Sequence, residues 1–327
     1  MRFPRIIDID HGKAMIVTDL HGDGYAYERL RSIFLSLREQ GKTDRLIICG
    51  DLLHHYGEER DDESLDMILD VMDLQNALGR DVVMMLMGNH EMPHIYGITL
   101  AKGEMEFTPR FEHAMNRSGM RDEIIDFLKS LPIYIRTKAG VLISHAGATP
   151  KITSEEDVEH ILTFDHDALL HLADDRLCNG YDLENLKQNK MYQQQASYYL
   201  AVDHPDDPRY HHLLRGQLLS QTEEEFSFLW EVLFATNEQG WNINGYNVVV
   251  HAFLKAMSQT SPYPQNVLLA GHIGVKGGHS IIGNWQLRLA SFAHAYPEDA
   301  GEYLLLDCEK TIARVADLLP HLRPTFD

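Results

Sequence analysis

The stretch DVVMMLMGNHE, from Asp81 to Glu91, decides the fold of this chain. Residues 82–87 are all apolar and run without alternation, which is typical of a short strand buried on both faces. Gly88 ends the run, and the polar residues 89–91 follow at once. Open α/β sheets bind ligands at the carboxyl ends of their strands. The stretch therefore predicts a buried strand whose end contributes polar side chains to a site.

Two earlier segments repeat this pattern. The apolar segment Ala14–Thr18 leads into Asp19 and His21, and the segment Arg45–Cys49 leads into Gly50 and Asp51. Helical patterns follow each segment, so the first part of the chain reads as repeated strand–loop–helix units with parallel strands. We therefore expect the polar residues after all three strands to meet at one edge of a sheet.

Two later strands end in the same way. Val141–Ser144 is followed by His145, and Val267–Ala270 is followed by Gly271 and His272. Carboxylates, imidazoles and an amide in this number exceed the ligands of one tetrahedral ion, and they suit a pair of ions that share a carboxylate. We expect two divalent or trivalent ions, manganese or iron, with zinc as the alternative. The six predicted metal ligands are Asp19, His21, Asp51, Asn89, His145 and His272.

The composition narrows the class of protein. The chain has 327 residues, a formal net charge of −20 and three cysteines without a CxxC spacing. The negative charge argues against binding to a nucleic-acid backbone or to an anionic membrane. Scattered, odd-numbered cysteines and the lack of a signal peptide or a long apolar run favour a cytoplasmic protein.

We expect one α/β domain over residues 1–327. Helices are predicted at Ser64–Leu78 and, as one continuous element, at Thr108–Lys129. Residues 151–225 contain crowded polar and aromatic side chains and no long strand pattern, so they are predicted to form a mainly helical insertion beside the site.

The ordered motifs resemble those of the calcineurin-like metallophosphoesterases, D-x-H, G-D, G-N-H-E, H and G-H. The glutamate after G-N-H makes the chain most similar to the phosphoprotein phosphatase branch, the serine/threonine phosphatases of the calcineurin and protein phosphatase 1 type. Phe127–Pro150 also resembles a segment of that branch, as do Leu229-Trp230 and Gly240-Trp241. The resemblance implies two facing mixed β-sheets flanked by helices.

The resemblance also implies roles for single residues. One ion would be held by Asp19, His21 and Asp51, and the other by Asp51, Asn89, His145 and His272. His90 would be the general acid that protonates the leaving oxygen. The implied reaction is hydrolysis of a phosphoester by a hydroxide that bridges the two ions, without a covalent enzyme intermediate.

The chain departs from the branch at the substrate clamp. Where the branch has an aspartate behind the catalytic histidine and an arginine that binds phosphate, this chain has His54 and His55. The branch has a second phosphate-binding arginine at a position that corresponds to the neighbourhood of Asn244, and this chain has no arginine there either. If His54 lies behind His90, the two rings share at most one proton, and His55 would contact phosphate through one donor instead of a fork. The alternative is that this loop has moved and neither histidine faces the metals.

The other histidines are expected to be structural. The second histidine of the family's G-H-x-H motif is Gly274 here, and His279 is a weaker candidate to take its place. The residues assigned structural roles are His113, His160, His171, His211, His212, His251 and His294.

Three functions stay open. The leading prediction is a metal-dependent phosphoesterase that acts on a phosphorylated substrate in the manner of a protein phosphatase. The loss of the arginines favours substrates without a free dianion, such as a phosphodiester or a dinucleoside polyphosphate. The alternative from another class is a pseudo-phosphatase that keeps the fold as a binding scaffold.

Overall fold

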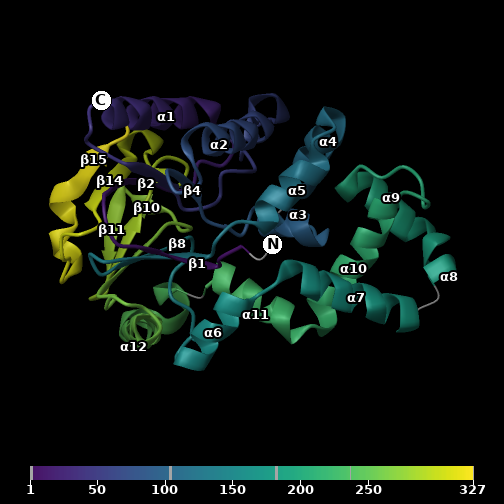
Figure 1. Cartoon of the computed structure of the whole chain (residues 1–327). Coiled ribbons are helices and arrows are strands. Elements are labelled where there is room, and N and C mark those ends of the chain that lie inside the picture. Colours follow the sequence, from purple (N-terminus) through teal and green to yellow (C-terminus); the bar gives the residue numbers. More distant parts are fainter. Residues whose placement is uncertain (1–2, 103–104, 181–182, 236, 327) are drawn as a thin grey trace.

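A computed structural model describes residues 3–102, 105–180, 183–235 and 237–326 (Figure 1). Its centre is a five-stranded mixed sheet that begins with the predicted repeats. β2, β3 and β4 are parallel neighbours, while β14 and β15 run antiparallel at the other edge. Across the sheet the strands are β15 (Leu322–Pro324), β14 (Glu302–Asp307), β2 (Lys13–Val17), β3 (Arg45–Ile48) and β4 (Val83–Met85).

A six-stranded mixed sheet faces the first. It contains the two later strands that the sequence predicts to carry ligands, β8 and β9, as parallel neighbours. Across the sheet the strands are β1 (Ile6–Ile9), β7 (Tyr134–Thr137), β8 (Val141–Ser144), β9 (Val267–Ala270), β12 (Gln286–Leu289) and β11 (His279–Ile282). Short two-stranded pairs join β10 (Val275–Lys276) to β13 (Ala295–Tyr296) and β5 (Ala101–Lys102) to β6 (Met105–Glu106).

Alternation along the strands separates the two faces of each sheet. Ile16 and Ile47 belong to the apolar cluster that also contains Ile143 and Leu269 of the other sheet, so these side chains fill the space between the sheets. Val17 and its neighbours on the opposite face pack instead on helices. Both faces of the central strands are therefore buried, which explains their continuous apolar sequence.

Helices cover the outer faces of both sheets. α1 (Gly24–Glu39) and α2 (Ser64–Leu78) follow the first two repeats, and both lie over the five-stranded sheet (Figure 1). α12 (Glu238–Gln259) packs on the six-stranded sheet, where Phe253 contacts Tyr134 with ring centroids 5.5 Å apart. The predicted α/β fold of two facing mixed sheets flanked by helices is confirmed.

The predicted helix Thr108–Lys129 is wrong as one element. It is two helices, α4 (Thr108–Ser118) and α5 (Arg121–Lys129). Gly119 separates them with φ of 72°, a left-handed conformation that ends a helix and that glycine adopts without strain.

Residues 151–225 contain helices that extend away from the sheets (Figure 1). They are α6 (Glu155–Thr163), α7 (His166–Gly180), α8 (Leu183–Lys187), α9 (Lys190–Leu200) and α10 (Pro208–Thr222). α11 (Glu224–Leu233) then leads to α12. Tyr96, the last residue of α3 (Met92–Tyr96), hydrogen bonds through its hydroxyl to Nδ1 of His166 at 2.5 Å, which ties α7 to the segment after β4. No helix in the described ranges has the length and apolar character needed to cross a membrane.

Candidate metal centre

The predicted ligands meet where the carboxyl ends of strands from both sheets come together. Asp19, His21 and Asp51 lie in the loops after β2 and β3, and each has a positive φ, between 43° and 50°. His272, after β9, has φ of 69°. Left-handed backbone is costly for residues other than glycine, and such strain concentrates at functional sites. The loops are therefore held in shapes that aim these side chains inward.

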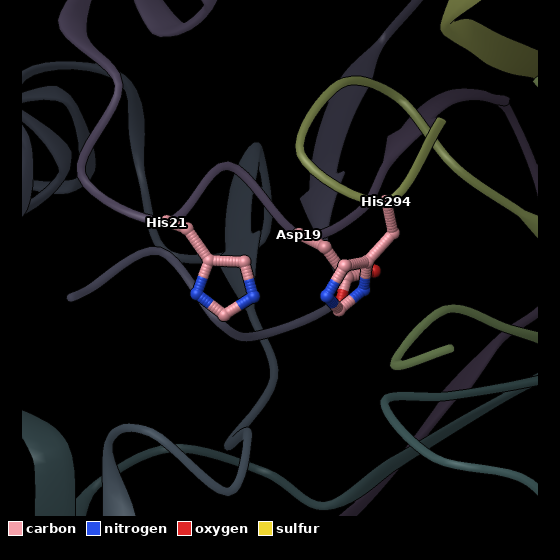
Figure 2. Close-up of side chains that lie close together, drawn as sticks. All are labelled: Asp19, His21 and His294. Carbon is pink, nitrogen blue, oxygen red and sulfur yellow. The ribbon is translucent and has the colours of Figure 1, made fainter. Parts of the chain in front are cut away.

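The first cluster of ligand atoms comes from Asp19, His21 and His294, all buried (Figure 2). Figure 2 shows Asp19 and His21 on one loop and His294 reaching towards Asp19 from a separate loop. Nδ1 of His294 lies 3.3 Å from Oδ1 of Asp19, and it is buried without a hydrogen-bond partner. An unpartnered buried nitrogen beside a carboxylate fits a position that a cation would fill.

His294 corrects the sequence analysis, which assigned it a structural role. It lies between β12 and β13, and it joins Asp19 and His21 in the first cluster, whereas Gly274 has no side chain that could bind a metal. His279 is elsewhere: its Nδ1 lies 2.5 Å from Oε2 of Glu302. The sequence offered no signal for His294, because it is separated from the end of β12 by an irregular loop and follows no strand directly.

Tyr56 is a second residue that the sequence analysis missed. Its hydroxyl lies 3.0 Å from Nε2 of His21 and 3.3 Å from Nε2 of His294. The phenol therefore covers the first cluster on the side where both imidazoles present nitrogen atoms.

The second cluster contains Asp51, His145 and His272, with Asn89 beside them. Oδ1 of Asn89 and Nδ1 of His272 lie 2.7 Å and 3.1 Å from Nε2 of His145. The main chain orients this group, because Nδ1 of His145 donates to the carbonyl of Cys49 at 2.9 Å and leaves Nε2 free to face the cluster.

Asp51 lies between the two clusters. Its Oδ2 is 3.6 Å from Nε2 of His21, and its Oδ1 is 3.5 Å from Nε2 of His145. Each carboxylate oxygen thus faces one cluster, which is the arrangement expected of a ligand shared by two ions.

The electrostatics of the centre also fit bound cations. Burial, followed by the charges of Glu91 and Asp19, raises the pKa of Asp51 well above its ordinary value. Burial is the main cause that lowers the pKa of His145, and burial followed by the neighbouring His145 lowers the pKa of His272 to about 3. Neutral imidazoles are the form that binds metals, and buried carboxylates need positive charge nearby. The donor set fits two metal ions.

Glu91 holds the loop that carries Asp51. Its Oε2 accepts hydrogen bonds from the backbone N–H groups of Asp51 and Gly88, both at 2.9 Å, and its Oε1 accepts from Leu52 at 2.9 Å. A Cβ atom on Gly88 would lie 2.4 Å from Oδ1 of Asp51 and 2.5 Å from Oε2 of Glu91. The glycine and glutamate of the opening stretch are therefore needed to bring two strand ends together.

His90 lies beside the clusters with Nε2 4.0 Å from Oδ2 of Asp51. Its backbone N–H donates to Oδ1 of Asp51 at 3.0 Å. Nδ1 points the other way, 3.0 Å from Nδ1 of His54. Burial and the neighbouring His54 lower the pKa of His90 well below its ordinary value. The structure thus places His54 behind His90, as one of the two sequence-based alternatives expected.

His55 does not reach the clusters. Its Nε2 lies 3.9 Å from Oδ2 of Asp23, and its Nδ1 accepts a hydrogen bond from the backbone N–H of Gly57 at 3.0 Å. The loop after His54 turns the ring of His55 towards Asp23 at the start of α1, which is the position expected from the alternative that His55 does not face the metals. Contact of His55 with a bound phosphate stays a prediction.

The position of the second expected arginine is also without a positive charge. Asn244 lies beside Asn242, whose Oδ1 accepts the backbone N–H groups of Asn244 and Gly245 at 3.1 Å each. Arg288 lies on β12, but both of its terminal nitrogens bind Glu238, at 2.7 Å and 2.8 Å. The described part of the chain therefore shows no arginine in either expected clamp position.

Comparison with known proteins gives the family and the fold. The model of the calcineurin-like phosphoesterase family matches residues 12–218. Among solved structures, the chain is similar to a protein serine/threonine phosphatase from Saccharomyces cerevisiae described as similar to human phosphatase PP5. The two share 13% sequence identity and a TM-score of 0.53 over 98% of this chain and 82% of that one. A metallophosphoesterase from Sphaerobacter thermophilus is 14% identical, with a TM-score of 0.33 over 94% and 92% of the two chains. No curated protein matches the sequence.

Proposed function

The chain belongs to the calcineurin-like phosphoesterase family, and from that membership we propose that it is a metal-dependent hydrolase that cleaves a phosphoester bond with water. The observation that carries the proposal is the position of Asp51. Its Oδ2 faces His21 of the first cluster, and its Oδ1 faces His145 of the second. A binding scaffold would not need this arrangement.

Each ion has a defined set of candidate ligands. Asp19, His21, Asp51 and His294 would hold the first ion. Asp51, Asn89, His145 and His272 would hold the second. Such a pair of ions, when bound, supplies Lewis acidity at a phosphoryl oxygen and lowers the pKa of water; manganese or iron suits these oxygen and nitrogen donors, with zinc as the alternative.

The protein itself supplies the proton for the leaving group. His90 directs Nε2 towards the metal clusters, while its Nδ1 is held by His54 on the opposite side of the ring. An imidazole in this position can donate a proton to a leaving oxygen next to the ions. We therefore propose that water is the nucleophile and that the reaction is a single displacement without a covalent enzyme intermediate.

The substrate is proposed from the missing clamp. A phosphomonoester dianion, as in a phosphoprotein, is bound best by a bidentate arginine fork. His55 faces Asp23, and Arg288 is already paired with Glu238. These contacts favour hydrolysis of a phosphodiester or a dinucleoside polyphosphate over hydrolysis of a phosphoprotein. The reaction chemistry is the same in both cases, and only the substrate differs.

One experiment tests the function. Purified protein is supplied with manganese and assayed on a monoester, a diester, a phosphopeptide and a dinucleoside polyphosphate, with a chelator control. We expect metal-dependent hydrolysis, with a higher kcat/KM for the diester or the dinucleotide than for the phosphopeptide. Metal binding without hydrolysis of any of the four would support the scaffold function instead.

We also propose that the protein acts in the cytoplasm. All three cysteines, Cys49, Cys178 and Cys308, are free thiols, and two of them are buried. Free thiols are typical of a reducing compartment.

A further inference from the structure

A line of buried hydrogen bonds runs from His90 away from the metal clusters. Nδ1 of His90 lies 3.0 Å from Nδ1 of His54, and Nε2 of His54 lies 2.8 Å from Nε2 of His94. Nδ1 of His94 then lies 2.8 Å from Oε1 of Glu112. Nε of Arg121 donates to the other oxygen, Oε2, at 3.0 Å. We call the four residues His54, His94, Glu112 and Arg121 the relay.

The relay is buried. The side chains of His94 and Glu112 are fully buried, and Arg121 is 8% exposed beside a surface pocket. Phe107 stacks on His54 with centroids 5.5 Å apart and an interplanar angle of 10°, and Phe111 contacts His94 edge-on at 4.9 Å. Buried polar groups are costly when they lack a hydrogen-bond partner, so we expect donors and acceptors to be matched along the whole line.

Arg121 and Glu112, at the end of the line away from His90, determine which atom donates and which accepts in every hydrogen bond of the line. Arg121 can only donate, and an ionised carboxylate can only accept. Burial alone would raise the pKa of Glu112, but the hydrogen bond from His94 and the charge of Arg121 bring it below its ordinary value, so the carboxylate is ionised at neutral pH. Nδ1 of His94 must therefore carry a proton.

A neutral imidazole has one donor and one acceptor nitrogen, and this fixes the rest of the line. If His94 is neutral with its proton on Nδ1, it accepts at Nε2, so His54 donates from its own Nε2. His54 then accepts at Nδ1, and His90 must donate from Nδ1. The unprotonated nitrogen of neutral His90 is consequently Nε2, the atom that faces the metal clusters.

We propose that Glu112, acting through His94 and His54, is a positioning residue that fixes the tautomer and orientation of His90. A proton taken up by His90 goes to Nε2, where a leaving oxygen can receive it, and all bonds of the relay stay intact. The negative charge that supports the resulting imidazolium is held two imidazoles away, on Glu112. This inference rests on the proposed function only in the statement that His90 delivers a proton.

The break between α4 and α5 makes the relay possible. Glu112 is on α4 and Arg121 is the first residue of α5. Gly119 turns the chain between them, and this turn allows Arg121 to reach back to the carboxylate of Glu112.

The first test is spectroscopic and uses metal-free protein. The imidazole nitrogens are labelled with ¹⁵N, and the signal of His90 is identified by its absence from a His90→Asn protein. We expect neutral His90 to be protonated at Nδ1 in the wild type. Glu112→Gln should remove that preference, because an amide can donate to His94 and reverse the line. His94→Phe, which interrupts the line while keeping an aromatic ring, should do the same.

The control is Asp8→Asn. Asp8 accepts two hydrogen bonds from Arg136, at 2.7 Å and 2.8 Å, in a carboxylate–arginine pair between β1 and β7. Its loss disturbs a pair of the same type outside the relay, and the His90 signal should not change. A wild-type His90 protonated at Nε2, or an unchanged tautomer in both Glu112→Gln and His94→Phe, would overturn the proposal.

The second test measures hydrolysis with manganese. Glu112→Gln should lower kcat by ~10–10²-fold for an alkyl phosphate ester, whose leaving oxygen needs a proton, and by less than ~3-fold for a nitrophenyl ester. In a His54→Asp background, where a carboxylate contacts His90 directly, Glu112→Gln should cause no further loss. Equal losses in both backgrounds would show a general structural role and overturn the proposal. If the wild type hydrolyses neither these esters nor any of the four substrates of the functional assay, the proposed function fails, while the tautomer measurement still decides the relay.

Discussion

Nδ1 of His54 faces Nδ1 of His90 at 3.0 Å, so a second imidazole stands where a carboxylate would stabilise a protonated catalytic histidine. The pair cannot hold a proton on both facing nitrogens. The first consequence concerns pH: a general acid is active while it is protonated, and its activity is lost as pH rises through its pKa.

His54→Asp should move the basic limb of the pH–rate profile to higher pH. Burial and His54 lower the pKa of His90 in the wild type, whereas an adjacent carboxylate would raise it. The measurement is kcat/KM for an alkyl phosphate ester against pH with manganese held constant. His55→Arg is the control for the loop, and it should leave the basic limb unchanged. Superimposable profiles for His54→Asp and the wild type would contradict the assignment.

His90→Asn should keep both metal ions and lower kcat by ~10²–10⁴-fold for a poor leaving group. The loss should be much smaller for nitrophenolate, which leaves without a proton. Steady-state kinetics on the two substrates, with metal content measured on the same sample, checks this. Equal losses on both substrates would mean that His90 is not the acid.

Asp51→Asn should weaken the binding of both ions, because one oxygen of Asp51 faces each cluster. Elemental analysis after desalting measures the metal content. Asp70→Asn is a suitable control, since Asp70 pairs with Arg31 on the outer helices and should keep two equivalents. Two full equivalents in Asp51→Asn would remove the shared-ligand assignment.

His294→Asn should lower the affinity for the first ion by at least ~10-fold and leave the affinity for the second ion unchanged. The reason is that Nδ1 of His294 lies beside Asp19, in the first cluster. Metal titration by calorimetry separates the two binding steps. His279→Asn, which removes a histidine paired with Glu302, provides the matched control and should leave both steps intact. Identical titrations for His294→Asn and the wild type would return His294 to a structural role.

Metal removal should lower the stability of the folded chain. Buried Asp19 and Asp51 carry charge that the ions balance, and a ligand that binds only the native state stabilises it by ~2.7 kcal/mol at a free concentration of about 100 times Kd. Thermal unfolding with manganese, with a chelator, and with manganese restored checks this. A Tm that is the same in all three conditions would argue against metal binding at these carboxylates.

Most of the fold was predictable because its signals are local. The parallel strands were visible as apolar runs that end in glycine and a polar residue, and β8 and β9 have the predicted bounds. The predicted ligands could be proposed for the same reason, since each lies in the loop that follows one of these strands, within four residues of the strand end.

The residues that were missed depend on contacts distant in sequence. His294 and Tyr56 lie in irregular loops, and neither follows a strand end directly. Glu112 and Arg121 become neighbours only because α4 and α5 separate at Gly119, whereas a continuous helix was expected. His94 was within reach of sequence analysis, because it follows His90 by one helical turn, but its role depends on Glu112.

Both sheets contribute ligands to each half of the candidate metal centre. Asp19 and Asp51 lie in loops of the five-stranded sheet, and His145 and His272 lie in loops of the six-stranded sheet. His294 follows β12 in the first cluster and Asn89 follows β4 in the second, so each cluster depends on the position of both sheets. If one sheet slid against the other, the ligand geometry of both clusters would change together. The magnetic coupling of two bound manganese ions would report such a movement.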